Sequence, residues 1–243
     1  MQVGSERQIQ RWSKLKHPEL KSLKCYICDY EDDISKFQVI KANDIFNAGE
    51  LIRYKCPQCE VIFGDLRFLN LSREEINNDY TDLYSYYKEG DTTQYIIQPL
   101  RKCGYLDKSK SILDYACGEW NKVITIFKSE GYDINGYDKF VGKYNTLPNK
   151  QFDIVYNNNY IEHLINPLED LKEILDLVKP GGLAIFLSSC FEYCIEYTHY
   201  HTFFFGDKSL DIICKKINLE LIYTNKIVFS NNIFNIVKVF KKL

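Results

Sequence analysis

The sequence predicts an α/β fold with a mainly parallel sheet, preceded by a small N-terminal unit. After about residue 109, strand-like and helix-like segments alternate, which is typical of parallel strands joined by helices that cover both faces of a sheet. The chain then ends in two strand-like segments that look antiparallel, so we expect the last strand to run against the others. Four cysteines in two CxxC pairs indicate that a metal ion stabilises the N-terminal unit.

The composition is that of an ordinary globular protein, with 45% apolar and 26% charged residues. The net charge of -2 gives no overall positive field that would attract nucleic acid. No uncharged apolar run reaches the roughly 18 residues of a membrane-spanning helix, and the N-terminus lacks the apolar core of a secretory signal. We therefore expect a cytoplasmic protein with no membrane partner.

The N-terminal third divides into an arm and a small strand-rich unit. Residues 1 to about 20 are polar and mixed in charge, which predicts an arm or a frayed helix. From Cys25 to Phe68 the runs FQVI, LIRYKC and VIFGDLRF are strand-like and lie between turn residues. The expected domains are an arm with a zinc ribbon (1–70), a helical lid or connector (71–108) and a sheet domain (109–243).

The two CxxC pairs are Cys25 with Cys28 and Cys56 with Cys59, separated by 27 residues. Each pair directs two thiolates toward one point, and two pairs together give the tetrahedral sulfur cage that Zn²⁺ prefers. A site closed by four cysteines has no open position, so we expect structural zinc rather than an iron or redox centre. Cys190 and Cys194 have the wrong spacing for a second site of this kind and are expected at a strand end.

The remaining elements follow from periodicity and from residues that start or stop helices. Residues 72–103 are expected to be helical, with Ser72 and Glu75 as a capping box. A second helix begins after Asn166, with Pro167 in its first turn, and ends before the Pro-Gly-Gly at 180–182. A third helix is DKSLDIICKKIN. The expected strands are SILDYA, YDINGYD, FDIVYN, GLAIFLSS, LELIYTN and FNIVKVFKK.

Residues 112–138 form one strand–helix–strand unit with two acids at the strand ends. Asp114 ends the first strand, and a tight turn through Ala116, Cys117 and Gly118 leads into the helix. Small residues allow a ligand to approach the backbone of such a turn closely. An acid at the end of the second strand, here Asp138, can accept hydrogen bonds from both hydroxyls of a ribose. The unit therefore predicts a nucleotide pocket, although a plain turn of this type also occurs without a ligand.

The segment FDIVYNNNYIEHLINPLEDLKEILDLVKPGGLAIF (152–186) resembles the fourth strand, helix and fifth strand of class I S-adenosylmethionine-dependent methyltransferases. ILDYACGEW resembles the first motif of that family, and GYD at 136–138 its second. The resemblance covers roughly residues 80–243 and implies a Rossmann-like sheet. With the CxxC pairs and HYHTFFFGDKSL, the chain is most similar to bacterial methyltransferases that modify sugars or cell-surface polysaccharide precursors.

This resemblance implies a set of cofactor-binding residues. Asp114 and Gly118 would lie along the methionine part, Asp138 would hold the ribose, and the turn from Asn157 to Asn159 would border the adenine and the methyl group. The full expected set is Asp114, Ala116, Cys117, Gly118, Asp138, Asn157, Asn158 and Asn159.

Two features depart from the family pattern. Trp120 stands where the family usually has a third glycine, and is expected as a wall of the pocket or as a core anchor under the helix. Only 13 residues separate Asp138 from Phe152, too few for a helix and a third strand. The acid that often binds the adenine amine in the family therefore has no clear counterpart.

Methyl transfer to a hydroxyl or an acidic C–H requires removal of a proton, and histidine titrates in the right range for that task. His163, His199 and His201 follow the two strands whose ends would line the active site, whereas His17 lies in the N-terminal arm. We expect His201 to be the leading candidate base, because it matches the His-x-x-x-Phe pattern of the family. His199 and His163 follow, and Glu162 would orient a histidine or bind the acceptor. Each also has a purely structural interpretation.

The resemblance implies methyl transfer to a small sugar-, nucleotide- or phosphate-bearing acceptor in capsule polysaccharide biosynthesis, with a phosphoramidate group as one option. A zinc-ribbon RNA methyltransferase is a second hypothesis, but the segment from Cys25 to Phe68 holds eight acidic and five basic residues, which disfavours RNA. A third is a non-catalytic interaction module in which Trp120 fills a lost cofactor site. An NAD-dependent enzyme is disfavoured by the terminal antiparallel pair.

Overall fold

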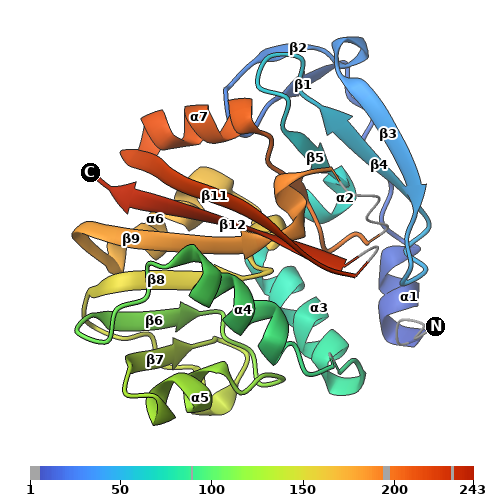
Figure 1. The fold of residues 1–243 in the computed structure, drawn as a ribbon. Helices are drawn as coiled ribbons and strands as arrows, with labels where there is room; N and C mark the ends of the chain where they lie inside the picture. The colour runs from blue at the N-terminus through green and yellow to red at the C-terminus, as the bar shows by residue number, and fades with distance from the viewer. Residues whose placement is uncertain (1–5, 89, 194–197, 231–232) are drawn as a thin grey trace. The chain divides into compact units, whose positions relative to one another are not determined.

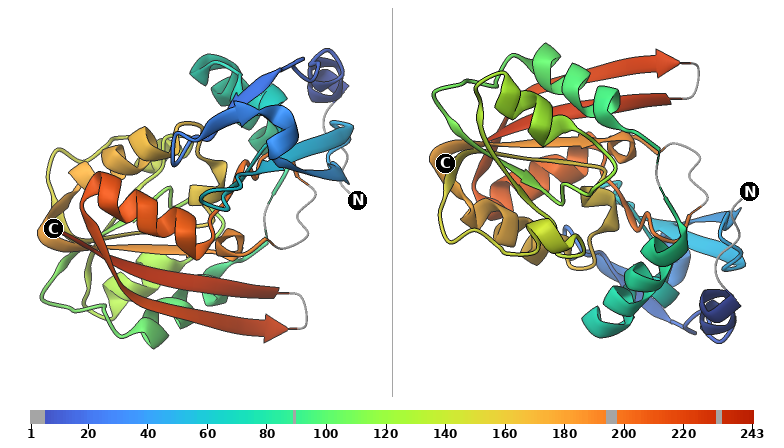
Figure 2. Two further views of the ribbon diagram at one scale, coloured as in Figure 1. Left: turned by 90° about the horizontal axis from the view of Figure 1, so that it is seen from above. Right: turned by 90° about the horizontal axis from the view of Figure 1, so that it is seen from below.

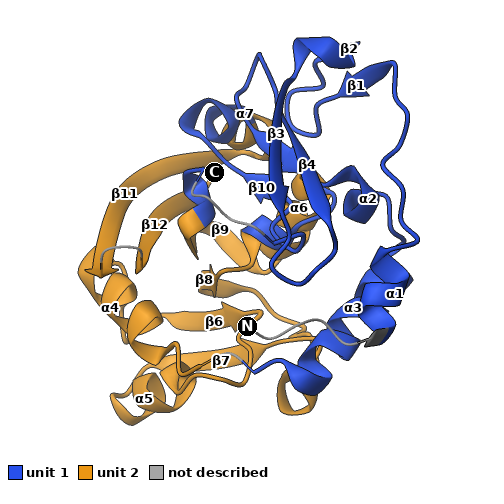
Figure 3. Cartoon of the chain, turned by 90° about the vertical axis from the view of Figure 1, so that its right-hand side faces the viewer, with its two compact units in different colours: residues 1–88, 162–166, 190–212 blue, residues 89–161, 167–189, 213–243 orange. Residues whose placement is uncertain are grey.

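The computed structural model describes residues 6–88, 90–193, 198–230 and 233–243. Its contacts group the chain into two compact units (Figure 3). Unit 1 takes residues up to 88, 162–166 and 190–212, and unit 2 takes 89–161, 167–189 and 213–243. The units interleave along the chain, and the expected domain boundaries near residues 70 and 108 stay a prediction. Cys194 lies outside the described residues.

Unit 2 contains a six-stranded sheet in the order β11-β12-β9-β8-β6-β7 (Figure 1). Strands β6, β7, β8 and β9 pair in parallel, and β12 is antiparallel to both of its neighbours. This confirms the predicted fold class, a mainly parallel Rossmann-like sheet whose last strand is antiparallel. The strands are β6 (Ser111–Tyr115), β7 (Asp133–Tyr137), β8 (Phe152–Asn158), β9 (Val178–Ser188), β11 (Leu219–Ser230) and β12 (Ile233–Lys242).

Strand β7 is an edge strand of this sheet. The chain between β7 and β8 holds only a short 3-10 helix, η2 (Gly142–Tyr144). Among the described residues, the additional strand that the family usually has between these two strands is therefore absent, and β7 pairs only with β6. This agrees with the short spacing between Asp138 and Phe152 in the sequence.

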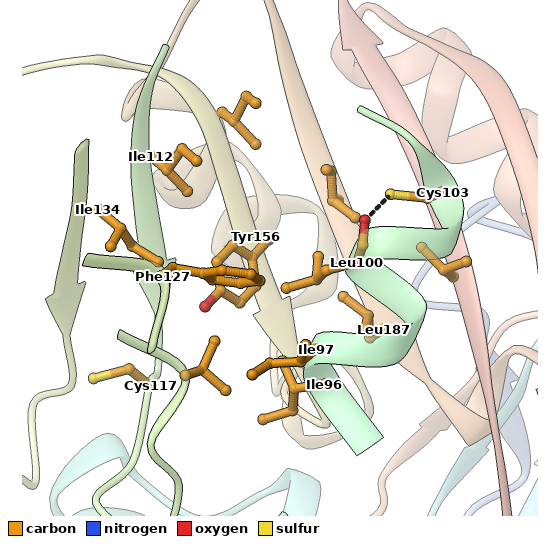
Figure 4. Close-up of a cluster of buried hydrophobic side chains, with 14 of the residues drawn as sticks. Ile96, Ile97, Leu100, Cys103, Ile112, Cys117, Phe127, Ile134, Tyr156 and Leu187 are labelled. Atoms are coloured by element: carbon orange, nitrogen blue, oxygen red, sulfur yellow. Dashed lines mark hydrogen bonds between the residues drawn. The ribbon is translucent and has the colours of Figure 1, made fainter. Parts of the chain in front are cut away.

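Helices cover both faces of the sheet of unit 2. Helices α4 (Thr93–Cys103) and α5 (Val123–Ser129) lie on one face and α6 (Pro167–Asp176) on the other (Figure 2). Ile97 and Leu100 of α4 and Phe127 of α5 pack with Tyr156 of β8 in one buried cluster (Figure 4). Burial of each large side chain of this kind contributes about 1.5–3 kcal/mol, so this face anchors β6 and β8 firmly.

The helical segment expected at 72–103 is two helices, α3 (Arg73–Tyr86) and α4. The capping box of Ser72 and Glu75 at the start of α3 is confirmed. The chain leaves helical conformation at Tyr87, and a new helix starts where the Asp91 carboxylate accepts a hydrogen bond from the Thr93 N–H. The polar run with Gly90 between the two helices is a break signal, but the expected helical segment was drawn through it.

Two helix ends also bear on the predictions. Helix α6 begins at Pro167 as expected but ends at Asp176. The Pro-Gly-Gly at 180–182 therefore lies inside β9 rather than in a loop before it. Helix α7 (Asp207–Ile217) confirms the third predicted helix.

Unit 1 contains a four-stranded antiparallel sheet in the order β10-β5-β4-β3. The run VIFGDLRF, expected as one strand, divides into β5 and the short helix α2 (Leu66–Leu69), because the Asp65 carboxylate caps the helix at the Arg67 N–H. The strands are β3 (Gln38–Asn43), β4 (Glu50–Lys55), β5 (Ile62–Gly64) and β10 (Phe203–Phe204), and a separate pair is β1 (Ser22–Lys24) with β2 (Glu31–Asp33), followed by η1 (Ile34–Lys36).

The N-terminal segment, expected as an arm or a frayed helix, contains a helix whose buried side chains pack within unit 1. Residues Glu6–Trp12 form helix α1, in which the Gln8 and Trp12 side chains are fully buried. The Trp12 indole N–H donates to Asp79 Oδ1 at 3.1 Å, and the Gln8 amide donates to the Asp79 carbonyl at 3.0 Å. These partners on α3 were too distant in sequence to be foreseen. Among the described residues, no helix is both long enough and apolar enough to cross a membrane.

Candidate functional site

The turn after β6 is held by the end of β7, within unit 2. Ala116 and Gly118 adopt left-handed backbone conformations, with φ of 58° and 60°. The Cys117 N–H donates to the Tyr137 carbonyl at 3.1 Å, and the Gly118 N–H donates to Asp138 Oδ2 at 2.9 Å. The two expected motifs are therefore joined by direct hydrogen bonds.

Asp138 is half-buried and oriented by backbone groups on both sides. Its Oδ2 accepts the Gly118 N–H, and its Oδ1 accepts the Phe140 N–H at 2.9 Å. A carboxylate offers about four lone-pair positions, so two hydrogen bonds leave capacity for two further donors. Such a carboxylate is suited to two neighbouring hydroxyls.

Gly136 lets β7 approach α5 and the turn closely. A Cβ at this position would lie 2.5 Å from Ile124 Cδ1 and 3.1 Å from Cys117 Sγ. A side chain here would force the Ile124 side chain and the Cys117 thiol to shift, so β7 could not approach α5 and the turn this closely without repacking. The glycine of the GYD motif is thus explained by packing.

Asp114 lies at the end of β6 and is buried. Its Oδ2 accepts a hydrogen bond from the Tyr156 hydroxyl at 2.6 Å. Burial raises the pKa of Asp114 to about 7, against the opposing effect of the Tyr156 hydrogen bond, and the nearby charge of Asp138 raises it further. The carboxyl group is therefore poised between its neutral and ionised forms near neutral pH, and a cation beside it would favour the ionised form.

The three asparagines at the end of β8 have different surroundings. Asn158 Oδ1 accepts a hydrogen bond from the Asn235 side chain at 2.8 Å. The Asn159 N–H donates to the Leu187 carbonyl, and its φ is 49°. Asn157 is fully buried, and its amide nitrogen and oxygen have no hydrogen-bond partner among the described residues. A buried amide without partners is costly, so Asn157 is suited to a polar ligand.

Trp120 is half-buried and does not belong to the buried cluster of unit 2. Its Cδ1 would lie 3.9 Å from a Cβ built on Gly118. The sequence suggested two roles for Trp120, a wall of the pocket or a core anchor under the helix. Its location beside the turn favours the pocket wall.

In unit 1, two segments far apart in the sequence are tied together. These are residues 162–166, which begin in η3 (Ile161–His163), and residues 198–205, which follow η4 (Ser189–Phe191) along the chain. The Thr202 N–H and hydroxyl donate to the Glu162 carbonyl at 2.7 and 3.0 Å. The buried Arg53 guanidinium donates to the Thr198 carbonyl at 2.6 Å and the His201 carbonyl at 3.3 Å. This network places three histidines in one region of unit 1.

The hydrogen bonds of His163 determine its tautomer. Its Nδ1 lies 2.9 Å from the Tyr200 backbone oxygen and 3.0 Å from the Tyr80 hydroxyl. Because a carbonyl oxygen can only accept, Nδ1 carries the proton. In the neutral ring Nε2 is then the atom with a lone pair, which suits a base or a metal ligand.

His201 and Glu162 lie beside His163. The rings of His163 and His201 have centroids 4.9 Å apart and are nearly perpendicular. His201 Nδ1 is 3.6 Å from the Cys190 thiol. One donor atom from each of Glu162, His163 and His201 lies within 4.8 Å of the other two, and Glu162 is fully buried. The structure thus brings together three of the four expected catalytic residues.

His199 is enclosed and held between two carboxylates. Its side chain is 1% exposed, with Nδ1 3.0 Å from Asp44 Oδ1 and Nε2 4.0 Å from Asp79 Oδ2. Phe68 stacks on the ring and Trp12 meets it edge-on. Burial alone would raise the pKa of Asp44 and Asp79, but the interactions with His199 help to lower it in both. This setting favours the structural interpretation of His199.

A pocket in unit 1 is lined by apolar side chains and by several polar groups near His163. No lysine or arginine stands among its described lining residues. These are Phe68, Leu71, Ile76, Asp79, Tyr80, His163, Ile165, His199, Tyr200 and Thr202.

The four cysteines of the CxxC pairs lie together in unit 1. Cys25 Sγ is 3.5 Å from Cys59 Sγ, and Cys28 Sγ is 3.6 Å from Cys56 Sγ. Four Zn–S bonds of about 2.3 Å in a tetrahedron place the sulfur atoms about 3.8 Å apart. A hydrogen bond from the Cys59 thiol lowers the pKa of Cys25 to about 5. The donor set therefore fits a zinc ion closely.

The two cysteine pairs also share one backbone conformation. The N–H groups of Asp29 and Glu60 donate to the carbonyls of Cys25 and Cys56, the first cysteine of each pair. Both residues have left-handed φ values, 62° and 63°. Two matching turns that face one point are the arrangement expected of a pair of zinc knuckles.

Residues 89–224 match the methyltransferase domain family, and this stretch covers more than half of the 243 residues. The chain belongs to the methyltransferase domain family. No curated protein shows significant sequence similarity to this methyltransferase.

Solved structures of methyltransferases are similar to this chain in fold. The methyltransferase resembles Burkholderia thailandensis 1,6-didemethyltoxoflavin-N1-methyltransferase, whose structure holds S-adenosylhomocysteine, with a TM-score of 0.54 and 13% identity over 79% of this chain and 95% of that one. It also matches magnesium protoporphyrin IX methyltransferase from Synechocystis, with a TM-score of 0.49 and 14% identity over 71% of this chain and 98% of that one. The expected enzyme class, an S-adenosylmethionine-dependent methyltransferase, is confirmed by family and fold.

Some residues that hold the candidate site residues in place were not found from the sequence. Tyr156 holds Asp114, Asn235 holds Asn158, and Tyr200 fixes the tautomer of His163. Asn235 lies 77 residues from its partner and Tyr156 42 residues from Asp114. Asn235 is a polar residue within the apolar run FNIVKVF and so offered a signal, but its partner, like that of Tyr156, is revealed only by the pairing of the strands.

Proposed function

We propose that this chain transfers a methyl group from S-adenosylmethionine to a small sugar- or phosphate-bearing acceptor in surface polysaccharide biosynthesis. The observation that carries the proposal is the pair of carboxylates Asp114 and Asp138, joined through Gly118 at the ends of two parallel strands. Ligands of open α/β sheets bind at this edge. Methylation of a phosphoramidate group is included as one form of this reaction.

Within this proposal each cofactor-binding residue has a role. Asp138 would accept hydrogen bonds from the ribose hydroxyls. The lone pairs of its carboxylate that are not used by the Gly118 and Phe140 N–H groups would receive them. Asp114 would pair with the positive methionine part of the cofactor. The side-chain amide of Asn157, which has no partner among the described residues, would donate and accept hydrogen bonds near the adenine, while Asn158 and Asn159 shape the turn. The turn through Ala116 and Cys117 would bring the backbone close to the cofactor, and Trp120 would form one wall of the pocket.

The acceptor proton would be handled by His163, His201 and Glu162. The sulfonium carries its own leaving group, so the acceptor oxygen, nitrogen or carbon gains the methyl group, S-adenosylhomocysteine leaves, and the acceptor proton must be removed. The tautomer of His163 supports it as the proton acceptor, ahead of His201. His199 supports the fold of this region instead of taking part in the chemistry.

The described pocket of unit 1 favours the sugar part of such an acceptor. Its apolar walls suit the C–H faces of a sugar ring, and its histidine, tyrosine and aspartate side chains suit hydroxyl groups. Phosphate recognition usually relies on arginine or lysine, and neither is found among the described lining residues. A phosphate on the acceptor would therefore bind elsewhere.

The proposal is tested by calorimetric titration of the purified protein with S-adenosylmethionine and S-adenosylhomocysteine. We expect saturable binding of both at one site per chain. A His163→Asn variant should bind both equally well and yet lose most methyl transfer, whereas His17→Asn should retain it. Absence of saturable binding would end the proposal.

The pKa of Asp114 predicts that cofactor binding depends on pH. The pKa of about 7 lies above the usual 3.8, so the free folded protein keeps a proton on Asp114 until the pH rises through 7. A cationic cofactor favours the ionised form, so affinity should rise from pH 6 to pH 8 by roughly tenfold, with release of up to one proton. Titrations in two buffers of different ionisation enthalpy measure that proton. Asp114→Asn should flatten the pH profile, and an unchanged profile in this variant would contradict the assignment.

We also propose that the four cysteines hold a structural zinc ion. Support comes from their sulfur spacing and from the matched turns at Asp29 and Glu60. A closed site of four thiolates leaves no position for the acceptor, so its contribution would be to the fold of unit 1.

The RNA methyltransferase hypothesis is further weakened by the location of the arginines. Arg53 and Arg67, two of the five basic residues between Cys25 and Phe68, are buried and bonded inside unit 1. Three lysines remain to contact phosphates against eight acidic residues, so a salt-sensitive RNA surface is not supported here. The interaction-module hypothesis is decided by the same cofactor titration.

A further inference from the structure

We propose that Glu162, His163 and His201 form a second metal site, which binds a divalent transition-metal ion such as Zn²⁺, Mn²⁺ or Co²⁺. The three residues come from the two tied segments of unit 1, and one donor atom of each lies within 4.8 Å of the others. Two imidazoles and one carboxylate are a common ligand set for such ions in proteins.

The distances permit an ion with little rearrangement. Three atoms within 4.8 Å of one another share a centre that is at most about 2.8 Å from each. Metal–nitrogen and metal–oxygen bonds are about 2.0–2.2 Å long, so each donor would have to move by less than about 1 Å. Rotation about side-chain bonds supplies movements of this size without a change in the backbone.

The surroundings of the two histidines match those of metal ligands. A ligating histidine usually donates its other ring N–H to a carbonyl or a similar group, which fixes the tautomer. His163 donates its Nδ1–H to the Tyr200 carbonyl, so in the neutral ring Nε2 carries the lone pair that a metal ion needs. His201 Nδ1 lies 3.6 Å from the Cys190 thiol, a contact that either tautomer of His201 can make.

The two segments that carry the ligands are also fixed relative to each other within unit 1. Thr202 bonds the Glu162 and Leu164 carbonyls, and Arg53 bonds the carbonyl of His201 itself. Tyr200 is in turn held by its hydroxyl, which donates to Asp79 Oδ2 at 2.7 Å. A preorganised ligand set of this kind needs little ordering when the ion binds.

This site differs in kind from the cysteine site. Three protein ligands leave at least one coordination position open, whereas four cysteines close the shell. His163 lines the described pocket, so a small molecule in that pocket could reach an ion beside it. This inference rests on the proposed methyl transfer but changes the role of His163, which would hold the ion through Nε2 instead of accepting the proton. The ion would bind an acceptor hydroxyl, lower its pKa and so promote loss of its proton to solvent before the oxygen attacks the methyl group.

The test is a metal titration of the full-length protein with its cysteine site already loaded with zinc. We expect elemental analysis to find one tightly held zinc per chain after dialysis against a weak chelator. Titration with Co²⁺ should then show a second equivalent, with visible absorption bands that lack sulfur-to-metal charge transfer. Glu162→Gln and His201→Asn should each weaken this second equivalent at least tenfold, while His17→Asn leaves it unchanged.

Two outcomes would overturn the second site. One is that the zinc-loaded protein binds no further Co²⁺, Mn²⁺ or Zn²⁺ below millimolar concentrations. The other is that it binds one equivalent that Glu162→Gln and His201→Asn do not weaken. Both variants are checked by thermal unfolding and by retention of the first zinc, so loss of fold is separable from loss of a ligand. S-adenosylmethionine binding is measured on the same samples: normal binding without the second metal removes only this inference, whereas absent binding removes the proposed function.

Discussion

Replacement of Asp138 by alanine is expected to lower the affinity for S-adenosylhomocysteine by a factor of about 100 or more. Asp138 would accept hydrogen bonds from both ribose hydroxyls, and a hydrogen bond to a charged group contributes about 1.5–3 kcal/mol. Loss of two such bonds costs at least about 3 kcal/mol, which corresponds to roughly a hundredfold. The variant also removes the acceptor for the Gly118 N–H, which adds to the loss. Calorimetric titration of the two proteins side by side measures the effect.

Two further variants separate ribose binding from support of the turn. Asp138→Asn keeps one oxygen for a hydrogen bond but loses the charge, so its affinity should fall between those of the wild type and the alanine variant. Asp133→Asn changes an exposed aspartate at the opposite end of the same strand and should bind normally. If Asp138→Ala bound the cofactor within threefold of the wild type while folding normally, Asp138 would not be the ribose ligand.

Much of unit 2 could be predicted because its signals are local. Apolar strands of four to six residues, the start of α6 at Pro167 and the acids that end β6 and β7 are each visible within a short window. The missing third strand was predicted from chain length alone, because 13 residues cannot hold a helix and a strand. The parallel order then followed from alternation of strands and helices.

The surroundings of the histidines could not be predicted in the same way. Whether His163, His199 or His201 is free to react depends on partners such as Asp44, Asp79 and the Tyr200 carbonyl, which lie in other segments. All three histidines follow a strand in the sequence, so we expected each of them as a candidate base, with His201 ahead. Burial and hydrogen bonding distinguish them: His199 is enclosed between two carboxylates, whereas His163 is only partly buried and lines the described pocket. Residues that act through contacts distant in sequence carry no local pattern.

The break between α3 and α4 illustrates a related limit. The capping box at Ser72 is local and was predicted, while the end of α3 at Tyr86 was not. The polar sequence with Gly90 that follows was not recognised as a break, and the next start signal, Asp91 with Thr93, is short and weak. Tertiary packing decides where such a helix ends.

Replacement of Cys59 by serine is expected to remove the structural zinc and unfold the region around it. Zinc in a small four-ligand site contributes an apparent binding free energy of about 10–16 kcal/mol, which is comparable with the whole stability of a domain. Strands β4 and β5 lead directly into and out of the Cys56–Cys59 turn, so they should lose protection when the ion leaves. Elemental analysis should show one zinc fewer per chain, and hydrogen exchange of residues 25–64 should become fast.

The matched control is Cys214→Ser, which changes a half-buried cysteine of α7 and should retain the zinc. Since the expected cofactor-binding residues all belong to unit 2, S-adenosylhomocysteine should still bind to Cys59→Ser, with an affinity changed by less than about tenfold. Methyl transfer should nevertheless be lost, because the three residues proposed to handle the acceptor proton belong to unit 1 together with the cysteines. Unchanged zinc content and unchanged exchange of residues 25–64 in Cys59→Ser would show that the cysteines do not hold a structural metal. Loss of cofactor binding together with the zinc would instead show that unit 2 depends on the metal for its own fold.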